Sequence, residues 1–256
     1  MEYSIITPAY NEEDKIIVSL TQMVSFMRSF SDSFEVIIIN DGSKDSTEEK
    51  VRAYSKENPE VKLLTIPHKG KGVAVSTGIM AAEGKYIYMA DADLSAPMSE
   101  LKKLSVWVQD QDYDIVIASR EGIGAKRIGE PLYRHIMGRV FNIFIQVLIL
   151  PGISDTQCGF KLFKNKVAKD VFGKLEIYNT EGKELEEAYL GAWDVEVLYL
   201  ARKMGYTIKQ VPVTWTYVKT TRLKPLKDSA KMALDVLKIR LNDLKGKYKT
   251  AQKPKK

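Results

Sequence analysis

Two carboxylates two positions apart, Asp91 and Asp93, are the residues of this 256-residue chain whose spacing points most directly to chemistry. In a turn, both side chains can face one hard cation, and Mg²⁺ or Mn²⁺ prefers oxygen ligands of this kind. Such a cation would bridge a diphosphate and stabilise the charge that develops as the diphosphate leaves. The alternative is that the two residues only cap a loop or the start of a helix.

Two further polar clusters, Thr7–Glu12 and Asn40–Ser43, also follow apolar runs. Asp41 in the second cluster fits two roles. Asp-Gly-Ser after a strand is ordinary turn chemistry, and a carboxylate at a strand end also hydrogen-bonds a ribose or a base edge in dinucleotide-binding folds.

The segment Lys69-Gly70-Lys71-Gly72 is similar to a phosphate cradle, although it lacks the spacing of a Walker loop or a dinucleotide fingerprint. Lys71 is therefore predicted either to contact a phosphate or to belong to a turn that enters a helix. His68, a lone histidine just before it, is expected to be an exposed loop residue.

Strands and helices alternate over the first 120 residues. Short apolar runs predict strands at Tyr3–Thr7, Phe34–Asn40, Val61–Ile66, Lys85–Ala90 and Asp114–Ala118. Helix-like stretches lie between them at Glu12–Phe30, Ser46–Lys56, Gly72–Ala82 and Ser99–Val108, and Ser43, Ser46 and Thr47 are capping candidates for the second of these helices. The pattern predicts an α/β fold, a Rossmann-like, doubly wound and mostly parallel sheet with flanking helices. Ligands bind beyond the carboxyl ends of such strands, so the three polar clusters are expected on one rim.

The second half of the chain is less regular. Its predicted elements are a helix at Tyr133–Leu150, a short strand at Phe160–Phe163, a helix at Asp194–Met204, an alternating strand at Tyr206–Tyr217 and a final helix at Leu226–Leu244. Neither an internal repeat nor a clear linker is visible, which favours a single domain.

Composition and charge exclude several classes of protein. With 45% hydrophobic and 28% charged residues, the chain is neither disordered nor fibrous, and its one cysteine, Cys158, cannot form an internal disulfide. The net charge is +6, but residues 224–256 hold 11 Lys/Arg against 3 Asp/Glu, so the remainder is at −2. A mildly acidic body argues against a nucleic-acid binder, whereas a basic C-terminal end suits an anionic membrane surface.

No segment is expected to cross a membrane. No targeting segment opens the chain, and the longest apolar stretch, Val140–Leu150, is about half of the ~20 residues that a span needs. The helix Tyr133–Leu150 is apolar apart from one narrow polar stripe, as in a helix that is buried or that lies in a membrane interface. The helix Leu226–Leu244 and the basic end favour peripheral attachment, against a helix packed on the sheet with a solvated tail.

Three N-terminal motifs resemble glycosyltransferase family 2, which has the GT-A fold and uses nucleotide-sugar donors: Pro8-Ala9-Tyr10-Asn11-Glu12, Asn40-Asp41-Gly42-Ser43 and Asp91-Ala92-Asp93-Leu94-Ser95. Two later motifs, Asp155–Phe163 and Trp193–Glu196, are similar to the dolichyl-phosphate β-glucosyltransferase branch, whose relatives include polyprenyl-phosphate mannose and glucose synthases. The resemblance covers about residues 3–245.

The resemblance implies an inverting, metal-dependent glycosyltransferase that moves glucose from UDP-glucose to dolichyl or polyprenyl phosphate at the cytoplasmic face of the membrane. It implies one GT-A domain over residues 1–245, with a nucleotide-sugar half to about residue 120 and an acceptor half after it, followed by a basic disordered tail at 246–256. The expected cofactor is a divalent metal, Mg²⁺ or Mn²⁺. The expected partners are the nucleotide sugar, the lipid phosphate and a membrane surface, but no nucleic acid.

The resemblance also assigns roles to residues. The nucleotide sugar would contact Pro8, Ala9, Tyr10, Glu12, Asp41, Lys71, Asp91, Ala92 and Asp93, and the metal would lie on Asp91 and Asp93. The catalytic residues would be Asp93, Arg127 and Asp155, the last as a base or as a positioning group. Arg222 and Lys224 would close over the diphosphate.

The acceptor, a lipid phosphate, is largely dianionic at neutral pH, so it needs a cationic seat more than a general base. Arg120, Arg127 and Arg134 lie where that seat is expected, and arginine suits forked phosphate contacts. The alternative is that these arginines form a solvated basic surface.

Three departures from the family pattern stand out. The eukaryotic members begin with a membrane anchor that is not found here, and Ser95 stands where several mannose-transferring relatives have a Gln that helps to hold the metal. The stretch Gly173–Ala192 is longer than the usual connection, which leaves open a flap, a partner surface or a variable loop.

Competing functions remain at this stage. One is a family 2 enzyme with another donor (GDP-mannose or UDP-N-acetylglucosamine) or with a saccharide acceptor. From another class comes a non-catalytic, membrane-associated protein that binds nucleotide sugars. A nucleotidyltransferase is disfavoured, because Pro8–Glu12 replaces its Gly-rich first loop.

Overall fold

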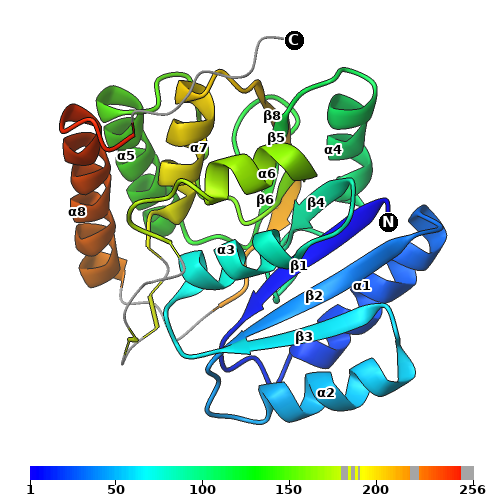
Figure 1. Ribbon diagram of the computed structural model, residues 1–256. Coiled ribbons are helices and arrows are strands. Elements are labelled where there is room, and N and C mark those ends of the chain that lie inside the picture. The colour runs from blue at the N-terminus through cyan, green and yellow to red at the C-terminus, as the bar shows by residue number, and fades with distance from the viewer. Residues whose placement is uncertain (180–183, 186–187, 190, 220–224, 249–256) are drawn as a thin grey trace.

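In a computed structural model, the chain forms a seven-stranded sheet with helices on both faces (Figure 1). The structure describes residues 1–179, 184–185, 188–189, 191–219 and 225–248. The strands of this sheet are β1 (Tyr3–Ala9), β2 (Phe34–Asp41), β3 (Val61–Ile66), β4 (Tyr86–Met89), β5 (Ile115–Ser119), β7 (Lys161–Lys164) and β8 (Ile208–Pro212). Their order is β3-β2-β1-β4-β7-β5-β8, and every pair is parallel except those of β7 with β4 and β5. The predicted α/β class with a mostly parallel sheet is confirmed.

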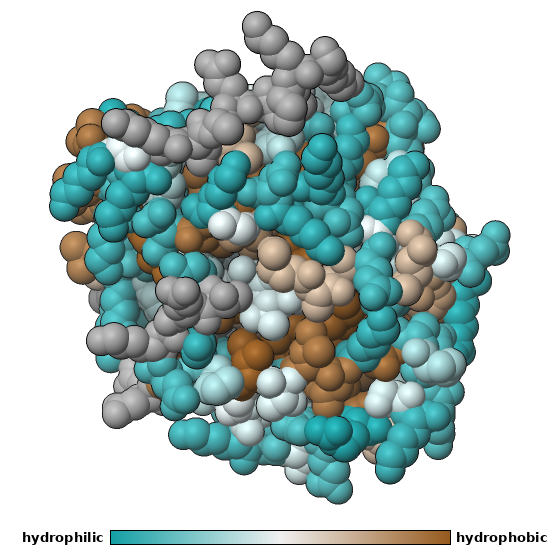
Figure 2. Space-filling model, in the orientation of Figure 1, coloured by the Kyte–Doolittle hydropathy of each residue, from teal (hydrophilic) through white to brown (hydrophobic). Residues whose placement is uncertain are grey.

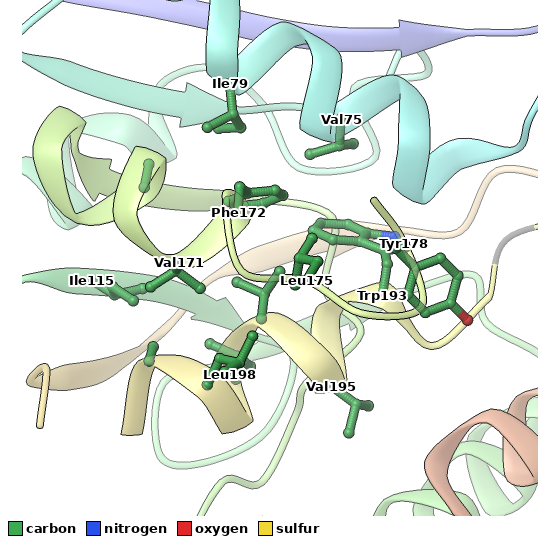
Figure 3. Packing of buried hydrophobic residues seen from close by; sticks show 14 of the residues in the cluster. Val75, Ile79, Ile115, Val171, Phe172, Leu175, Tyr178, Trp193, Val195 and Leu198 are labelled. Carbon is green, nitrogen blue, oxygen red and sulfur yellow. The ribbon is translucent and has the colours of Figure 1, made fainter. Parts of the chain in front are cut away.

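The helices divide between the two faces. They are α1 (Ile16–Phe30), α2 (Thr47–Glu57), α3 (Lys71–Ala81), α4 (Glu100–Gln109), α5 (Leu132–Leu148), α6 (Asn165–Phe172), α7 (Trp193–Lys203) and α8 (Pro225–Leu244). Side chains of α1 and α4 pack in one hydrophobic cluster, and those of α3, α6 and α7 pack in the other (Figure 3). Alternate strand residues enter alternate clusters, as Val36 and Ile37 do in β2, because successive side chains of a strand point to opposite faces.

Strand register brings the polar clusters together. In β1, Ala9 lies opposite Asn40 of β2, and Ile6 lies opposite Met89 of β4. The residues that follow these three parallel strands therefore share one edge of the sheet, as the sequence predicts.

The predicted strand Tyr206–Tyr217 is two strands. β8 ends at Pro212, which has no N–H to donate, and β9 (Thr214–Thr216) pairs instead with β6 (Lys126–Ile128) in a small second sheet. Val213 bridges the two sheets, since its N–H donates to the Ser119 carbonyl at 3.1 Å and its carbonyl accepts from Lys126 N–H at 3.0 Å. The strand β6 and the helix α6 are not predicted from the sequence.

The C-terminal end differs from the expectation of a disordered tail from residue 246. Tyr248 is fully buried, and its hydroxyl donates to Glu196 Oε1 at 2.6 Å. Its ring also packs edge-on against Tyr199 of α7. The packed chain thus reaches at least Tyr248, and the remaining tail residues, 249–256, lie outside the described residues, as do Arg222 and Lys224.

Candidate active site

One cavity of about 420 Å³ lies at the carboxyl edge of the sheet, and it brings together both halves of the chain. Apart from Arg222 and Lys224, which lie outside the described residues, the site residues predicted from the sequence all line it: Pro8, Ala9, Tyr10, Glu12, Asp41, Lys71, Asp91, Ala92, Asp93, Arg120, Arg127, Arg134 and Asp155. The resemblance therefore selects residues that are far apart in sequence and that share one space. The geometry below shows what each of them contacts.

Asp41, at the end of β2, holds the loop that leads into α3. Its two carboxylate oxygens accept from the backbone N–H groups of Lys69 (2.8 Å) and Gly70 (2.9 Å). Burial raises the pKa of Asp41, while these amides and His68 oppose that rise. Asp41 thus organises a turn, and it also lines the cavity, where its contact with a ribose or a base stays a prediction.

His68 is not the exposed loop residue that the sequence suggested. Its side chain is 9% exposed, its Nδ1 lies 2.8 Å from Asp41 Oδ2, and its ring stacks on Tyr10 at 4.0 Å between centroids, 10° from parallel. The expectation was wrong because these partners lie 27 and 58 positions away in the sequence, so local pattern carries no sign of them. The result is an aromatic wall on the side of the cavity formed by the loops after β1 and β3.

The loop after β1 is tied to the loop after β2 by residues expected to cap α2. Ser43 Oγ accepts from Asn11 N–H at 3.0 Å, and Thr47 Oγ1 accepts from Glu12 N–H at 2.8 Å. Ser46 occupies the N-cap position but makes no capping hydrogen bond with its side chain. Asn11 has φ of +52°, a left-handed conformation that Asn tolerates. The side chains of Ser43 and Thr47 thus connect the loops after β1 and β2 and do not stabilise the end of a helix.

The carboxylate pair lies beyond β4. Lys71 Nζ is 2.6 Å from Asp91 Oδ1, and Asp93 Oδ1 accepts from Ser95 Oγ (2.5 Å) and Ser95 N–H (3.0 Å). Gly159 backs the pair so closely that a Cβ at this position would stand 1.9 Å from Asp91 Oδ2. Only glycine leaves room for Asp91 there.

These residues fit a divalent cation that is shared with a diphosphate. The described residues contain no cluster of three or more His, Cys, Asp or Glu side chains able to hold a metal by themselves. Mg²⁺ is usually bound by one or two carboxylates together with substrate phosphates, and Asp91 and Asp93 supply such a pair. Lys71, already held on Asp91, shows that a positive charge is accommodated at this point.

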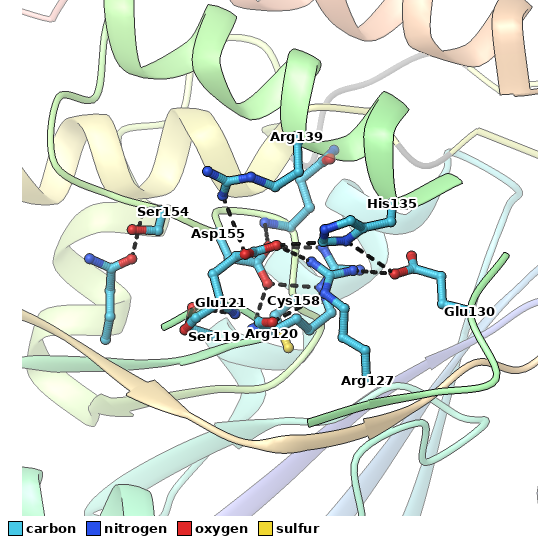
Figure 4. A network of polar contacts seen from close by, with 12 residues as sticks. Ser119, Arg120, Glu121, Arg127, Glu130, His135, Arg139, Ser154, Asp155 and Cys158 are labelled. Atoms are coloured by element: carbon cyan, nitrogen blue, oxygen red, sulfur yellow. Dashed lines mark hydrogen bonds and ion pairs between the residues drawn. The ribbon is translucent and has the colours of Figure 1, made fainter. Parts of the chain in front are cut away.

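Asp155 and Arg120 form a forked ion pair beyond β5, on the other side of the cavity (Figure 4). Arg120 Nε and Nη2 each lie 2.8 Å from one oxygen of Asp155, and the Arg120 backbone N–H donates to Oδ2 at 2.9 Å. Although burial opposes ionisation, the charge and hydrogen bonds of Arg120 lower the pKa of Asp155 to about 2. A carboxylate held this firmly in its charged form is a weak proton acceptor, which favours the positioning role for Asp155.

Arg127 is neutralised by two glutamates (Figure 4). Its guanidinium lies 2.5 Å from Glu121 and 2.6 Å from Glu130, and its Nε donates to the Arg120 carbonyl at 3.1 Å. Arg134, in contrast, lies over the Tyr217 ring and has no carboxylate partner within the part of the chain that the structure describes. Of the three predicted arginines, Arg134 therefore presents the least compensated charge.

Lys161 and Asp194 lie in the motifs Asp155–Phe163 and Trp193–Glu196, but the sequence alone indicates no role for either residue. Asp194 lines the cavity, and burial raises its pKa to about 6 against the opposing charges of Lys161 and Lys71. Lys161 is fully buried, 4.0 Å from Asp194 and 2.5 Å from the Cys158 carbonyl, and burial lowers its pKa. The available signal was a charged residue between apolar neighbours, Phe160 and Leu162 around Lys161 and Trp193 and Val195 around Asp194, since such a residue is rarely buried without a partner.

The outer surface beside the cavity is apolar on two neighbouring helices, α5 and α8 (Figure 1). The exposed apolar residues are Leu132, Tyr133, Ile136, Val140, Ile143 and Val147 on α5, and Leu234, Leu237, Leu241 and Leu244 on α8. Figure 2 shows such side chains at the left edge of the molecule, over these helices. On α5 the polar stripe points the other way, since Arg139 and Asn142 line the cavity. Among the described residues, no helix is both long and apolar enough to span a bilayer.

The family profile described as Glycosyl transferase family 2 matches residues 4–172. The chain belongs to glycosyltransferase family 2. It is 37% identical to a dolichyl-phosphate β-glucosyltransferase of Dictyostelium discoideum, over 96% of this chain and 76% of the relative. Human dolichyl-phosphate β-glucosyltransferase is 31% identical over 98% of this chain and 78% of its own length. The predicted family and branch are confirmed.

Solved structures show the same fold. Glucosyl-3-phosphoglycerate synthase from Mycobacterium tuberculosis, in complex with Mn²⁺ and UDP-glucose, aligns with a TM-score of 0.64 over 93% of this chain and 78% of that chain, at 17% identity. A mannosyltransferase from Pyrobaculum calidifontis, in complex with GDP-mannose and Mn²⁺, aligns with a TM-score of 0.56 over 99% and 76%, also at 17% identity. The predicted GT-A fold is confirmed.

Proposed function

We propose that this glycosyltransferase moves glucose from UDP-glucose to dolichyl phosphate or a related polyprenyl phosphate, with inversion at the anomeric carbon. The observation that carries the proposal is that one cavity brings the paired carboxylates beyond β4 and the arginines beyond β5 together beside α5, whose outer face is apolar. The relatives named as dolichyl-phosphate β-glucosyltransferases support the glucosyl group and the lipid acceptor.

The donor end suits a uridine diphosphate. The stacked Tyr10–His68 pair offers an aromatic surface to the base, with Pro8, Ala9 and Glu12 beside it in the cavity wall. Lys71 and Ala92, which line the same cavity, are assigned to the diphosphate. Asp41 contributes by holding the His68–Gly70 loop in place.

The divalent cation is assigned to Asp91 and Asp93. When bound, it would neutralise the diphosphate and so favour departure of UDP. Gly159 fixes Asp91 from behind, and Ser95 orients Asp93 by donating two hydrogen bonds to one of its oxygens. Lys71 would move from Asp91 to the phosphate oxygens as the donor enters, because its Nζ already lies at the edge of this site.

The acceptor end requires a seat for a dianionic phosphate. Arg134 is assigned to direct phosphate contact, because its guanidinium has only the Tyr217 ring as a partner among the described residues. Arg120 and Arg127 are paired with carboxylates, which compensate their charge and fix the orientation of their guanidinium groups. Because the lipid phosphate is already ionised, no residue needs to remove a proton from it.

The exposed faces of α5 and α8 are assigned to the membrane surface, and the cytoplasmic face is the one we propose. Helices of this kind, apolar outward and polar toward the protein, lie in the interface plane. Exposed lysines on α8 and the Lys-rich residues 249–256 add attraction to anionic lipid, at about 1 kcal/mol each near the surface. The exposed apolar face of α5 beside the cavity supports a path along this helix for the lipid tail of the acceptor, with its phosphate in the cavity.

A panel of radiolabelled nucleotide sugars, each incubated with purified protein, dolichyl phosphate and Mn²⁺ or Mg²⁺, tests this proposal. We expect label from UDP-glucose in the organic phase, and little from GDP-mannose or UDP-N-acetylglucosamine. EDTA should abolish the transfer, and Asp93→Asn should lower it by about 10²-fold or more. Preferential transfer from another donor would contradict the assignment of UDP-glucose, and full activity in EDTA would contradict the metal.

A further inference from the structure

Asp235 is a buried carboxylate on α8 that lies outside the cavity wall. It is 5% exposed and faces the protein, whereas its neighbour Leu234 is 58% exposed. Its oxygens accept hydrogen bonds from the hydroxyl groups of Tyr178 (2.5 Å) and Tyr189, and Lys238 Nζ lies at 3.1 Å. Asp235 therefore fixes the positions of two tyrosine side chains at once, because both hydroxyl groups donate to one charged carboxylate.

Tyr178 packs closely against two glycines. A Cβ at Gly72 or Gly191 would stand 2.7 Å and 2.5 Å from the Tyr178 side chain, so both glycines make room for it. Its hydroxyl also accepts from Ala192 N–H at 2.6 Å. Figure 3 shows the Tyr178 ring beside Trp193, with its oxygen pointing out of the hydrophobic cluster. Burial and the charge of Asp235 raise the pKa of Tyr178, so the phenol stays a donor.

Tyr189 carries the connection onward to the donor loop. Its carbonyl accepts from Lys71 N–H at 3.3 Å, and it would lie 3.2 Å from a Cβ at Gly70. Close by, Leu185 N–H donates to the His68 carbonyl at 2.7 Å. Two backbone hydrogen bonds therefore join this part of the chain to the loop His68–Lys71, which lies more than 110 positions earlier.

The loop His68–Lys71 contacts all three predicted donor clusters. His68 stacks on Tyr10, His68 and the next two backbone amides bind Asp41, and Lys71 binds Asp91. A shift of this loop would move the base wall and the diphosphate lysine together. No contact of Asp235 reaches the acceptor arginines directly in the described residues.

We propose that Asp235 is a positioning residue for donor binding, which acts through Tyr178 and Tyr189 to hold the loop His68–Lys71 in its donor-binding arrangement. The inference rests on the proposed function only in naming UDP-glucose as the donor. It gives a role to three described residues of the stretch Gly173–Ala192, because Tyr178 and Tyr189 contact α8 while Leu185 and Tyr189 contact the loop His68–Lys71. Because α8 also carries the exposed leucines, the same helix connects the proposed membrane surface to the donor site.

The test compares Asp235→Asn with Asp243→Asn, a matched control on the same helix whose carboxylate pairs with Lys203 and Arg240. Asn keeps the shape of the side chain but removes the charge that holds both phenols. We expect amide hydrogen exchange at residues 69–71 to speed up by about fivefold or more in Asp235→Asn, and the KM for UDP-glucose to rise by about the same factor. The kcat at saturating donor and the KM for dolichyl phosphate should stay within about twofold.

Each of these measurements either supports the positioning role of Asp235 or overturns it. A folded Asp235→Asn protein with wild-type exchange at residues 69–71 and a wild-type KM for UDP-glucose overturns the proposal, as does an equal effect of Asp243→Asn. If Asp235→Asn does not fold, Tyr189→Phe removes one of the two hydroxyl groups that donate to the same carboxylate, and the same exchange rates and KM values decide. Its control is Tyr206→Phe, which removes a hydroxyl that donates to Asp170. The exchange measurement needs no substrate, so it stands even where wild-type protein proves not to use UDP-glucose.

Discussion

Asp194 is the residue whose charge state should change near physiological pH, because burial raises its pKa to about 6. Its pKa in the unfolded chain is about 4. The folded state therefore binds the proton more tightly, so the contribution of Asp194 to stability is most favourable below about pH 4 and declines as the pH rises to about 6.

As the pH rises from 4 to 6.5, the free energy of unfolding of the wild type should thus fall by up to about 3 kcal/mol relative to that of Asp194→Asn. Urea unfolding of both proteins at several pH values measures this shift. A difference that is flat over this range would show that the carboxyl is not perturbed.

Gly159 is the second residue with a sharp expectation, because a methyl group there meets Asp91 Oδ2 at 1.9 Å. Gly159→Ala should destabilise the protein by about 1–3 kcal/mol, as overpacking does. In an Asp91→Ala background most of this cost should vanish, because the opposing carboxylate is gone. Thermal unfolding of the four proteins measures the coupling, and an equal cost in both backgrounds would place the strain elsewhere.

At this scale, the sequence could predict the residues that directly follow strands. Asp41, Asp91 and Asp93 lie in the cavity because each ends or follows a parallel strand. The partners of His68 and Arg127 could not be predicted in the same way. They come from loops whose approach depends on how the whole chain packs.

The helix α5 is the element that separates the polar site from the apolar surface. Val140 and Val147 are 62% and 80% exposed, whereas Phe144 stacks on Phe141 and packs against the core. Phe144→Glu would therefore test folding, and the two valines are the better probes of lipid contact.

Val140→Glu and Val147→Glu should each lower binding to anionic vesicles by about tenfold, since a charge replaces an apolar group at the interface. Val106→Glu on α4, a residue that is 48% exposed on another helix, is the matched control. Circular dichroism must show that all three proteins are folded. Vesicle binding at the wild-type level by both α5 variants would rule out this face as the membrane contact.

Most element positions were predictable, because apolar periodicity and strand-ending residues mark them. The direction and place of β7 were not, since a four-residue apolar run looks the same whether its pairing is parallel or antiparallel. Periodicity also left α5 undecided between core and interface. Only the fold shows that its polar stripe faces the cavity.

At the scale of the whole molecule, one cavity collects residues from both halves of the chain at the carboxyl edge of the sheet, and α5 separates this cavity from the exposed apolar surface. We therefore expect the sugar to be transferred to the phosphate of an acceptor whose tail lies in a lipid surface. The fold alone does not require a lipid acceptor. A structural neighbour with this fold is named glucosyl-3-phosphoglycerate synthase, and glucosyl-3-phosphoglycerate carries no lipid.

The most direct measurement offers UDP-[¹⁴C]glucose and Mn²⁺ to the purified protein with one of three acceptors: dolichyl phosphate in vesicles, dolichol in vesicles, or 3-phosphoglycerate in solution. The account predicts label in the organic phase with dolichyl phosphate alone, as a β-linked glucosyl phosphate, and loss of that label in Arg134→Ala with the KM for UDP-glucose near wild type. Transfer to 3-phosphoglycerate without transfer to dolichyl phosphate would contradict it.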